Sequence, residues 1–316
     1  MSEPKAEDRS GATFALLGFS VLIWGAAFWP IDVASDHTSP IVLAMLRVVP
    51  TLAVVLVIFS IFRRRLPQGR LLAASALSGL LIFGFFQWVL MDSVVTIGPG
   101  NTAVMVNTAP LVIAVLGFIF LRERLGALAS LGLVIGFLGV VMMIWSQIGD
   151  FPSAGMLIGG VALAFAGAAA WGSGLLLLRA VMRDRTGIDM IGVTVVQYAA
   201  GAVVLLPVAF FVTGVSGTDW GALGLWIGVI WIGPVTAVAF LILFIVLQRI
   251  EAARATSVLF LIPAVAIVIE IARGNAPGAV ALAGMFVAIL GVGLVTAPRG
   301  MIGRSTLRFG VLRARL

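Results

Sequence analysis

The sequence has no cysteine, one histidine and one tyrosine among 316 residues, and only 10% of its residues are charged. Without cysteine the chain can form no disulfide framework, thiolate metal site or cysteine nucleophile. The single histidine, His37, rules out a metal site built from several imidazoles. The low charge also argues against a soluble domain, in which about 25% of residues are charged.

The residues that are abundant are apolar. Hydrophobic residues make up 61% of the chain, and the mean hydropathy is +1.19, which indicates an integral membrane protein. The net charge of +7 could suggest a nucleic-acid partner, but the basic residues are scattered between apolar runs, so we expect none. Residues 1–11 are polar and of mixed charge, and they lack the short apolar core of a removable signal peptide.

Ten apolar segments of about 20 residues are each long enough to cross a bilayer as an α-helix. Their connections are short and rich in Gly, Pro, Asp and Arg, which leaves no room for a soluble domain. The sequence therefore predicts an all-α integral membrane protein with ten transmembrane helices. The expected spans, numbered 1 to 10 below, are approximately 12–31, 40–62, 71–91, 101–121, 126–146, 155–178, 189–212, 221–247, 255–272 and 279–297.

The lysines and arginines predict the orientation of these spans. Basic residues precede span 1 and follow spans 2, 4, 6, 8 and 10, whereas the opposite loops carry aspartates and a single basic residue, Arg273. Positive charge is retained in the cytoplasm, so both termini are predicted to be cytoplasmic.

Similar residue patterns occur in the first and the second half of the chain. Residues 101–124 read NTAVMVNTAPLVIAVLGFIFLRER, and residues 254–271 read RATSVLFLIPAVAIVIEI, with Pro263 in the place of Pro110. Trp-Gly pairs recur in spans 1 and 6, at Trp24 and Trp171. Because each half has an odd number of spans, the halves should be antiparallel copies.

We therefore predict two inverted five-helix repeats, residues 1–148 and residues 149–316, the second ending in a basic cytoplasmic tail. Inverted repeats are typical of secondary transporters, which hold their substrate near the midplane between the halves.

Pro110 and Pro263 should each remove a backbone hydrogen bond from a spanning helix. Such freed groups are tolerated where protein or a wet cavity satisfies them. A packing kink is the alternative, but the repeat-equivalent positions favour a hinge or cavity role.

Arg47 in span 2 is costly inside a membrane and is a candidate functional charge. Its alternative is to extend outward and pair with Asp32, Asp36 or Asp92. Near the end of span 9, Glu270 and Arg273 are three residues apart and should form a local helical pair.

Several uncharged polar side chains lie within the expected spans. They could join helices to one another or contact a substrate, and both interpretations stay open. They are Asn101, Thr102, Asn107 and Thr108 on one face of span 4, Gln87 in span 3 and Gln197 in span 7.

Aromatic side chains cluster in four spans. Trp24 and Trp171 lie well inside spans 1 and 6, span 3 carries aromatics that include Phe83, and span 8 carries Phe240 and Phe244. Such faces often belong to a core, but a cavity with aromatic walls and few charges would suit apolar or aromatic solutes.

No carboxylate lies at the centre of any expected span. Proton-coupled carriers usually retain an intramembrane Asp or Glu as relay. The sequence therefore predicts facilitated passage with weak or no proton coupling.

Taken together, the ten spans, the Trp-Gly pairs, Arg47 and the A-P-L…L-R-E-R run of span 4 resemble the EamA branch of the drug/metabolite transporter superfamily. Within it, the aromatic-rich spans 1 and 3 are most similar to the YddG group of aromatic amino-acid exporters. The resemblance implies a basket of ten helices around a central cavity. It places seven residues near that cavity: Trp24, Phe83, Gln87, Asn101, Trp171, Phe240 and Phe244.

The sequence thus predicts an inner-membrane transporter that exports aromatic and other apolar amino acids by alternating access. The substrate would contact those seven residues and Asn107, with Arg47, Pro110 and Pro263 in gating or charge roles. A multidrug or other metabolite exporter on the same fold is the alternative. No enzyme activity, cofactor or metal is expected, the other partner is membrane lipid, and the protein should be a monomer or weak dimer.

Overall fold

A computed structural model describes residues 6–121, 126–147, 153–182, 187–236, 238–239, 242 and 261–296. Every regular element among these residues is a helix. In the first half they are α1 (Ala6–Ala26), α2 (Phe28–Ser35), α3 (Pro40–Ile61), α4 (Arg70–Gly79), π-helical η1 (Leu80–Phe85), α5 (Phe86–Ile97), α6 (Pro99–Val106), α7 (Ala109–Leu121) and α8 (Ala127–Gln147). In the second half they are α9 (Ala154–Met182), α10 (Met190–Pro207), π-helical η2 (Val208–Thr213), α11 (Leu223–Ile230), π-helical η3 (Trp231–Val235), α14 (Ile262–Ala272) and α15 (Ala279–Thr296).

Seven helical stretches in the described part are long and apolar enough to cross a membrane, so the chain is a multi-pass membrane protein. They fall in the ranges expected for spans 1 to 7. Three shorter apolar helices, at 223–235, 262–272 and 279–295, lie where spans 8 to 10 are expected. The total of ten remains a prediction.

Several expected spans are not continuous α-helices. Span 1 has a turn at Ala27 between α1 and α2, and span 4 is divided between α6 and α7. Spans 3, 7 and 8 each contain a π-helical segment, η1, η2 and η3 respectively. A π-helical turn contains more residues than an α-helical turn, and single π-helical turns inside α-helices are frequent at functional sites.

The expectation that Pro110 and Pro263 interrupt continuous helices is wrong. Each proline is the second residue of a new helix, Pro110 in α7 and Pro263 in α14. In the first turn of a helix the backbone N–H has no intrahelical acceptor, so proline there removes no helical hydrogen bond.

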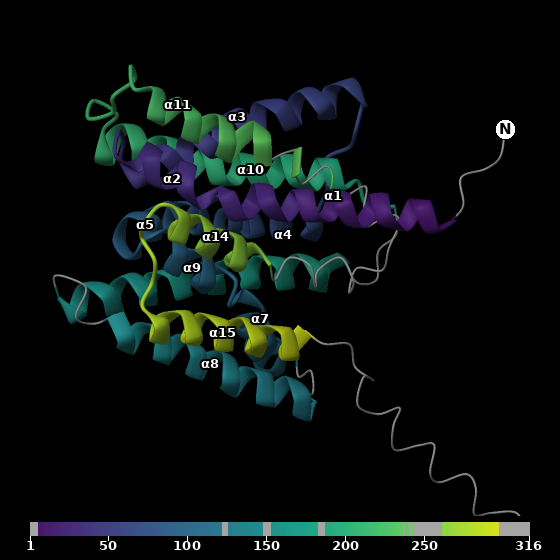
Figure 1. Ribbon diagram of the computed structural model, residues 1–316. Coiled ribbons are helices and arrows are strands. Elements are labelled where there is room, and N and C mark those ends of the chain that lie inside the picture. The colour runs from purple at the N-terminus through teal and green to yellow at the C-terminus, as the bar shows by residue number, and fades with distance from the viewer. Residues whose placement is uncertain are drawn as a thin grey trace, which may run out of the picture.

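Figure 1 shows the helices running side by side, with α8 and α15 together at one edge and α3 and α11 toward the opposite edge. Helices of the first half pack mainly on helices of the second: α3 on α10, α4 and α5 on α9, α2 on α11, α1 on α14, and α8 on α15. The largest group of buried apolar side chains lies among α2, α3, α5, α10 and α11.

The pair α8–α15 is the most closely packed of these contacts. A Cβ atom added at Gly139 would lie 2.2 Å from the backbone nitrogen of Ala288, and one added at Gly291 would lie 2.2 Å from that of Gly136. Backbone therefore touches backbone, as small residues allow between membrane helices.

Candidate functional site

Aromatic side chains of span 3 form two stacks with helices of the second half. The ring of Phe83 in η1 lies 3.9 Å from that of Tyr198 in α10, measured between centroids. The ring of Phe86 at the start of α5 lies 5.6 Å from that of Trp171 in α9, at an interplanar angle of 14°. The close approach of span 3 to α10 depends on Gly201, where a Cβ would lie 2.5 Å from the carbonyl oxygen of Phe83. Phe83 thus lies in span 3 itself, and Trp171 of α9 packs against the same span at Phe86.

Gln87 lies beside these stacks, directly after Phe86 and one turn after Phe83. Its side chain is only 5% exposed, and its Oε1 atom has no hydrogen-bond partner among the described residues. A buried amide oxygen without a partner costs free energy, so its retention needs a reason. Gln197, the other intramembrane glutamine, instead donates from Nε2 to the Ser78 hydroxyl over 2.9 Å. Gln197 therefore joins α10 to α4, whereas Gln87 is left with an unused acceptor.

We expect Gln87→Leu to keep the free energy of unfolding unchanged or to raise it by about 1 kcal/mol, because it removes an unsatisfied buried group. Gln197→Leu should lower it by about 0.6–1.7 kcal/mol, the range for hydrogen bonds between membrane helices. Denaturant unfolding in mixed micelles measures both. Equal losses at the two positions would show that Gln87 also joins helices.

The polar face of span 4 is engaged with its own backbone. Asn101 donates to the carbonyl of Ile97 and Asn107 to that of Ala103, each over 2.8 Å. Thr102 and Thr108 likewise donate to carbonyls one turn earlier. Side chains of this type compete with helical hydrogen bonds, and α6 indeed ends at Val106, just before Asn107.

The break in span 4 faces α14. Asn107, Thr108 and Pro263 line a gap of about 10 Å³. That is close to the smallest volume that holds one water molecule. The gap brings Asn107 together with Pro263, one of the two prolines singled out in the sequence.

Arg47 does not form the ion pair considered for it. Among the described residues no carboxylate pairs with Arg47, and the nearby group with which it interacts electrostatically is Tyr198. Pairing with Asp32, Asp36 or Asp92 is therefore wrong. Arg47 lies beside the Phe83–Tyr198 stack as an intramembrane cation, which keeps it a candidate functional charge.

A charge cluster joins the two halves at one end of the molecule. The Nη1 atom of Arg273 lies 2.9 Å from Asp32 Oδ2, in α2, and 2.9 Å from Glu270 Oε1, in α14. The Glu270–Arg273 pair was predicted and is present. The contact with Asp32 was missed, because residues 241 positions apart give no local signal.

A second link between the halves lies where α3 leads into α4. Asp189 precedes α10, and its Oδ1 accepts from the backbone N–H groups of Ile191 and Gly192. Its Oδ2 accepts from the backbone N–H of Arg65 over 3.0 Å. The Arg65 bond first, then those from Gly192 and Ile191 and the charge of Arg64, hold the pKa of the Asp189 carboxyl below its ordinary value.

Asp189→Ala should destabilise the protein by about 1 kcal/mol, the usual cost of losing a helix N-cap. Because the folded-state pKa lies below the unfolded value of about 3.9, the stabilisation is present above about pH 4 and is lost as pH falls through the folded pKa. Unfolding curves of both proteins should therefore differ at pH 7, and the difference should shrink as the pH falls through the folded-state pKa. A difference that does not shrink at all on acidification would mean that the charge of Asp189 is not responsible.

Trp24 is half-buried in α1, beside the contact between α1 and α14. A Cβ at Gly25 would lie 2.5 Å from the Val265 side chain of α14. The positions of Phe240 and Phe244 lie outside the described residues, as do residues 122–125, which include the charged end of span 4.

Comparison with known proteins identifies the family to which this chain is related. Residues 9–145 and 158–297 both match the model of the EamA-like transporter family. The chain belongs to the EamA-like transporter family. Membership indicates a membrane transporter rather than an enzyme.

The relatives of this EamA chain include uncharacterized transporters of Bacillus subtilis. YvbV is 27% identical over 81% of this chain and 82% of its own length, and YyaM is 27% identical over 88% and 90%. A crystal structure matches with a TM-score of 0.61 at 20% identity, over 90% of this chain and 98% of that one, and supports the fold.

Proposed function

We propose that this EamA protein exports aromatic and other apolar amino acids across the inner membrane, as a member similar to the YddG group. The observation that carries the proposal is the cluster of two aromatic stacks beside the free acceptor of Gln87. Ring faces suit an aromatic or apolar side chain. An amide oxygen accepts hydrogen bonds from an ammonium group, which has only donors.

The binding site that we propose includes residues of this cluster and further residues from both halves. Its substrate contacts are Trp24, Phe83, Gln87, Asn101, Asn107, Trp171, Phe240 and Phe244. Pro110 and Pro263, at the starts of α7 and α14, act as hinges, because a helix that begins at a proline can swing about the preceding turn. Arg47 supplies the intramembrane positive charge.

Alternating access between two inverted five-helix repeats, 1–148 and 149–316, is the mechanism that we propose. The helix pairings support it, because they recur when the halves are exchanged. The pairing of α1 with α14 has its counterpart in α9 with α6 and α7, and that of α5 with α9 in α2 with α11. Ten spans, cytoplasmic termini and a monomer or weak dimer complete the proposal.

Transport is proposed to be facilitative. Among the described residues Glu270 is the only buried carboxylate, and it pairs with Arg273 near one end of the molecule. A proton relay calls for a titratable group along the path. A several-fold change in flux on collapsing a pH gradient, at a fixed substrate gradient, would contradict this part.

The test is flux of labelled phenylalanine into proteoliposomes, with unlabelled threonine or a cationic dye as competitor. Saturable flux blocked by amino acids and not by the dye would support the proposal. Gln87→Leu should lower the flux at least tenfold, whereas Gln197→Leu should keep the flux per folded molecule. Dye movement without phenylalanine flux would favour the multidrug alternative.

A further inference from the structure

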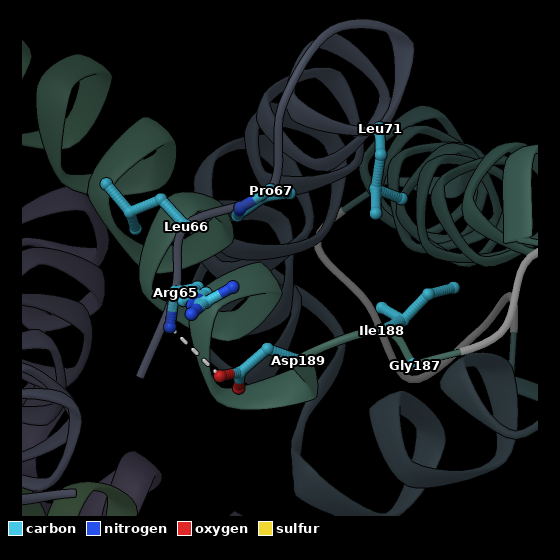
Figure 2. Close-up of a pocket in the computed structure, with 7 residues that line it drawn as sticks. All are labelled: Arg65, Leu66, Pro67, Leu71, Gly187, Ile188 and Asp189. Carbon is cyan, nitrogen blue, oxygen red and sulfur yellow. Dashed lines mark hydrogen bonds between the residues drawn. The ribbon is translucent and has the colours of Figure 1, made fainter. Parts of the chain in front are cut away.

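A hollow of about 550 Å³ lies between the segment that joins α3 to α4 and the segment that enters α10. Its lining includes Arg65, Leu66 and Pro67 of the first segment and Ile188 and Asp189 of the second, all drawn in Figure 2. Leu71 and Gly187 complete the lining. Apolar surface and charge therefore meet in one hollow, outside the aromatic cluster described above.

The segment that joins α3 to α4, beside the hollow, carries a surplus of positive charge. Four exposed arginines lie within eight residues, at positions 63, 64, 65 and 70; Arg65 lines the hollow itself, and none of the four pairs with a carboxylate in the part of the chain that the structure describes. The adjacent carboxylate, Asp189, is already occupied by three backbone N–H groups. The arginines are thus available to an anion.

The backbone conformation at Arg63 indicates that its side chain has a function. Its φ angle is +46°, and it is the one non-glycine residue with a positive φ among the described residues. This left-handed conformation is unfavourable for a residue with a Cβ atom and free of strain for glycine. An arginine held in it suggests a functional reason.

Apolar side chains surround the arginines on the side toward the membrane span. Ile61, Phe62 and Leu66 are 68%, 62% and 50% exposed, at the end of α3 where that span ends. The Arg64 guanidinium lies 5.7 Å from the centre of the Phe62 ring. A free anion makes no favourable contact with this apolar surface, whereas a lipid presents a phosphate next to an acyl chain.

The corresponding connection in the second half, residues 214–222 after η2, contains no lysine or arginine. In the inverted arrangement that connection is predicted to lie on the opposite side of the membrane, so the charges belong to the predicted cytoplasmic end of the molecule.

We propose that this basic segment beside the hollow binds the phosphate of an anionic phospholipid, with the headgroup at Arg63, Arg64 and Arg70 and an acyl chain along Phe62 and Leu66. Clusters of basic residues beside a membrane span attract anionic lipids in this way. The site is independent of the transported substrate, so it stands whether or not the protein carries amino acids.

The test is thermal unfolding of the full chain in neutral detergent with added phosphatidylglycerol, phosphatidylcholine or inorganic phosphate. We expect phosphatidylglycerol alone to raise the unfolding temperature by several degrees. The triple variant R63Q/R64Q/R70Q should lose most of that rise. The matched control R304Q/R308Q/R313Q, which removes the same charge from the C-terminal tail, should keep it.

A rise of equal size with phosphatidylcholine or with phosphate alone, or one retained in R63Q/R64Q/R70Q, would overturn the proposal. If the triple variant fails to fold, the single variant Arg63→Gly still tests the proposal. Glycine suits the left-handed backbone at this position, so the variant should be at least as stable as the parent without lipid. It should nevertheless show a clearly smaller rise with phosphatidylglycerol, and an unchanged rise would contradict the site.

Discussion

Gly291→Val should leave almost no folded protein in the membrane. The Cβ atom would lie 2.2 Å from the backbone nitrogen of Gly136 and 2.3 Å from its Cα. Neither atom can move unless α8 and α15 separate, so we expect a cost above about 3 kcal/mol, the upper end of ordinary overpacking. The measurement is the yield of monodisperse protein on size-exclusion chromatography after detergent extraction, followed by the unfolding temperature.

Gly293→Ala is the matched control in the same helix. A Cβ at Gly293 meets no atom within 4 Å, so this substitution should be neutral or slightly stabilising through helix propensity. Gly291→Ala should already lower the unfolding temperature markedly. If the two alanine variants behave alike, α8 and α15 do not cross at this point.

Residue spacing predicts which glycines share a helix face but not which helix covers them. Gly132 and Gly155 each begin a Gly-x-x-x-Gly pattern. A Cβ at Gly132 would lie 2.7 Å from the carbonyl oxygen of Gly291, whereas one at Gly155 or Gly159 meets at most the Ser153 hydroxyl of its own segment. The partner helix lies about 150 residues away, and sequence distance does not reveal it.

The same limit applies to the polar candidates. Gln87 and Gln197 look alike in the sequence, since each is a lone amide inside an apolar span. Only the neighbouring helices distinguish them: Gln197 donates to Ser78, whereas the oxygen of Gln87 has no partner in the part of the chain that the structure describes. The positions of the spans, in contrast, could be predicted well, since apolar length and turn residues are local properties.

The break in span 4 was missed although a local signal exists. A residue that precedes proline is disfavoured in the α conformation, so Pro110 argues for a helix boundary just before it. The side chains of Asn107 and Thr108 add to it by bonding back to carbonyls of the preceding turn. These residues were interpreted as partners for other helices or for a substrate, whereas the structure shows that they hydrogen-bond to the backbone of their own span.

Cross-linking Asp32 to Arg273 should stop transport. The two side chains join α2 to the end of α14 through a 2.9 Å ion pair, at the end of the molecule predicted to face outward. Alternating access requires that end to open, so a covalent link across it should reduce the flux by more than about tenfold. A reducible dithiol-reactive linker on D32C/R273C tests this directly, because the chain has no other cysteine. An arginine side chain is long, so a short linker is better suited than a direct disulfide.

Reduction of the linker should restore the flux, and the single variants D32C and R273C should transport normally after the same treatment. Replacing Asp32 should cost little stability, since partly exposed pairs contribute about 1 kcal/mol or less. Replacing Arg273 should cost more, because it also leaves the buried Glu270 carboxylate without its partner, so flux is compared per folded molecule.

The link at the other end provides the contrast. Arg65 and Asp189 connect segments of α3 and α10, which pack along their length, and a Cβ at Gly192 would lie 2.0 Å from the carbonyl oxygen of Arg65. Because that contact belongs to a continuous helix interface, cross-linked R65C/D189C should still transport. Flux that survives the link at Asp32 and stops with the link at Asp189 would place the moving interface at the opposite end. The ion pairs of Arg273 would then be contacts that stay intact during transport.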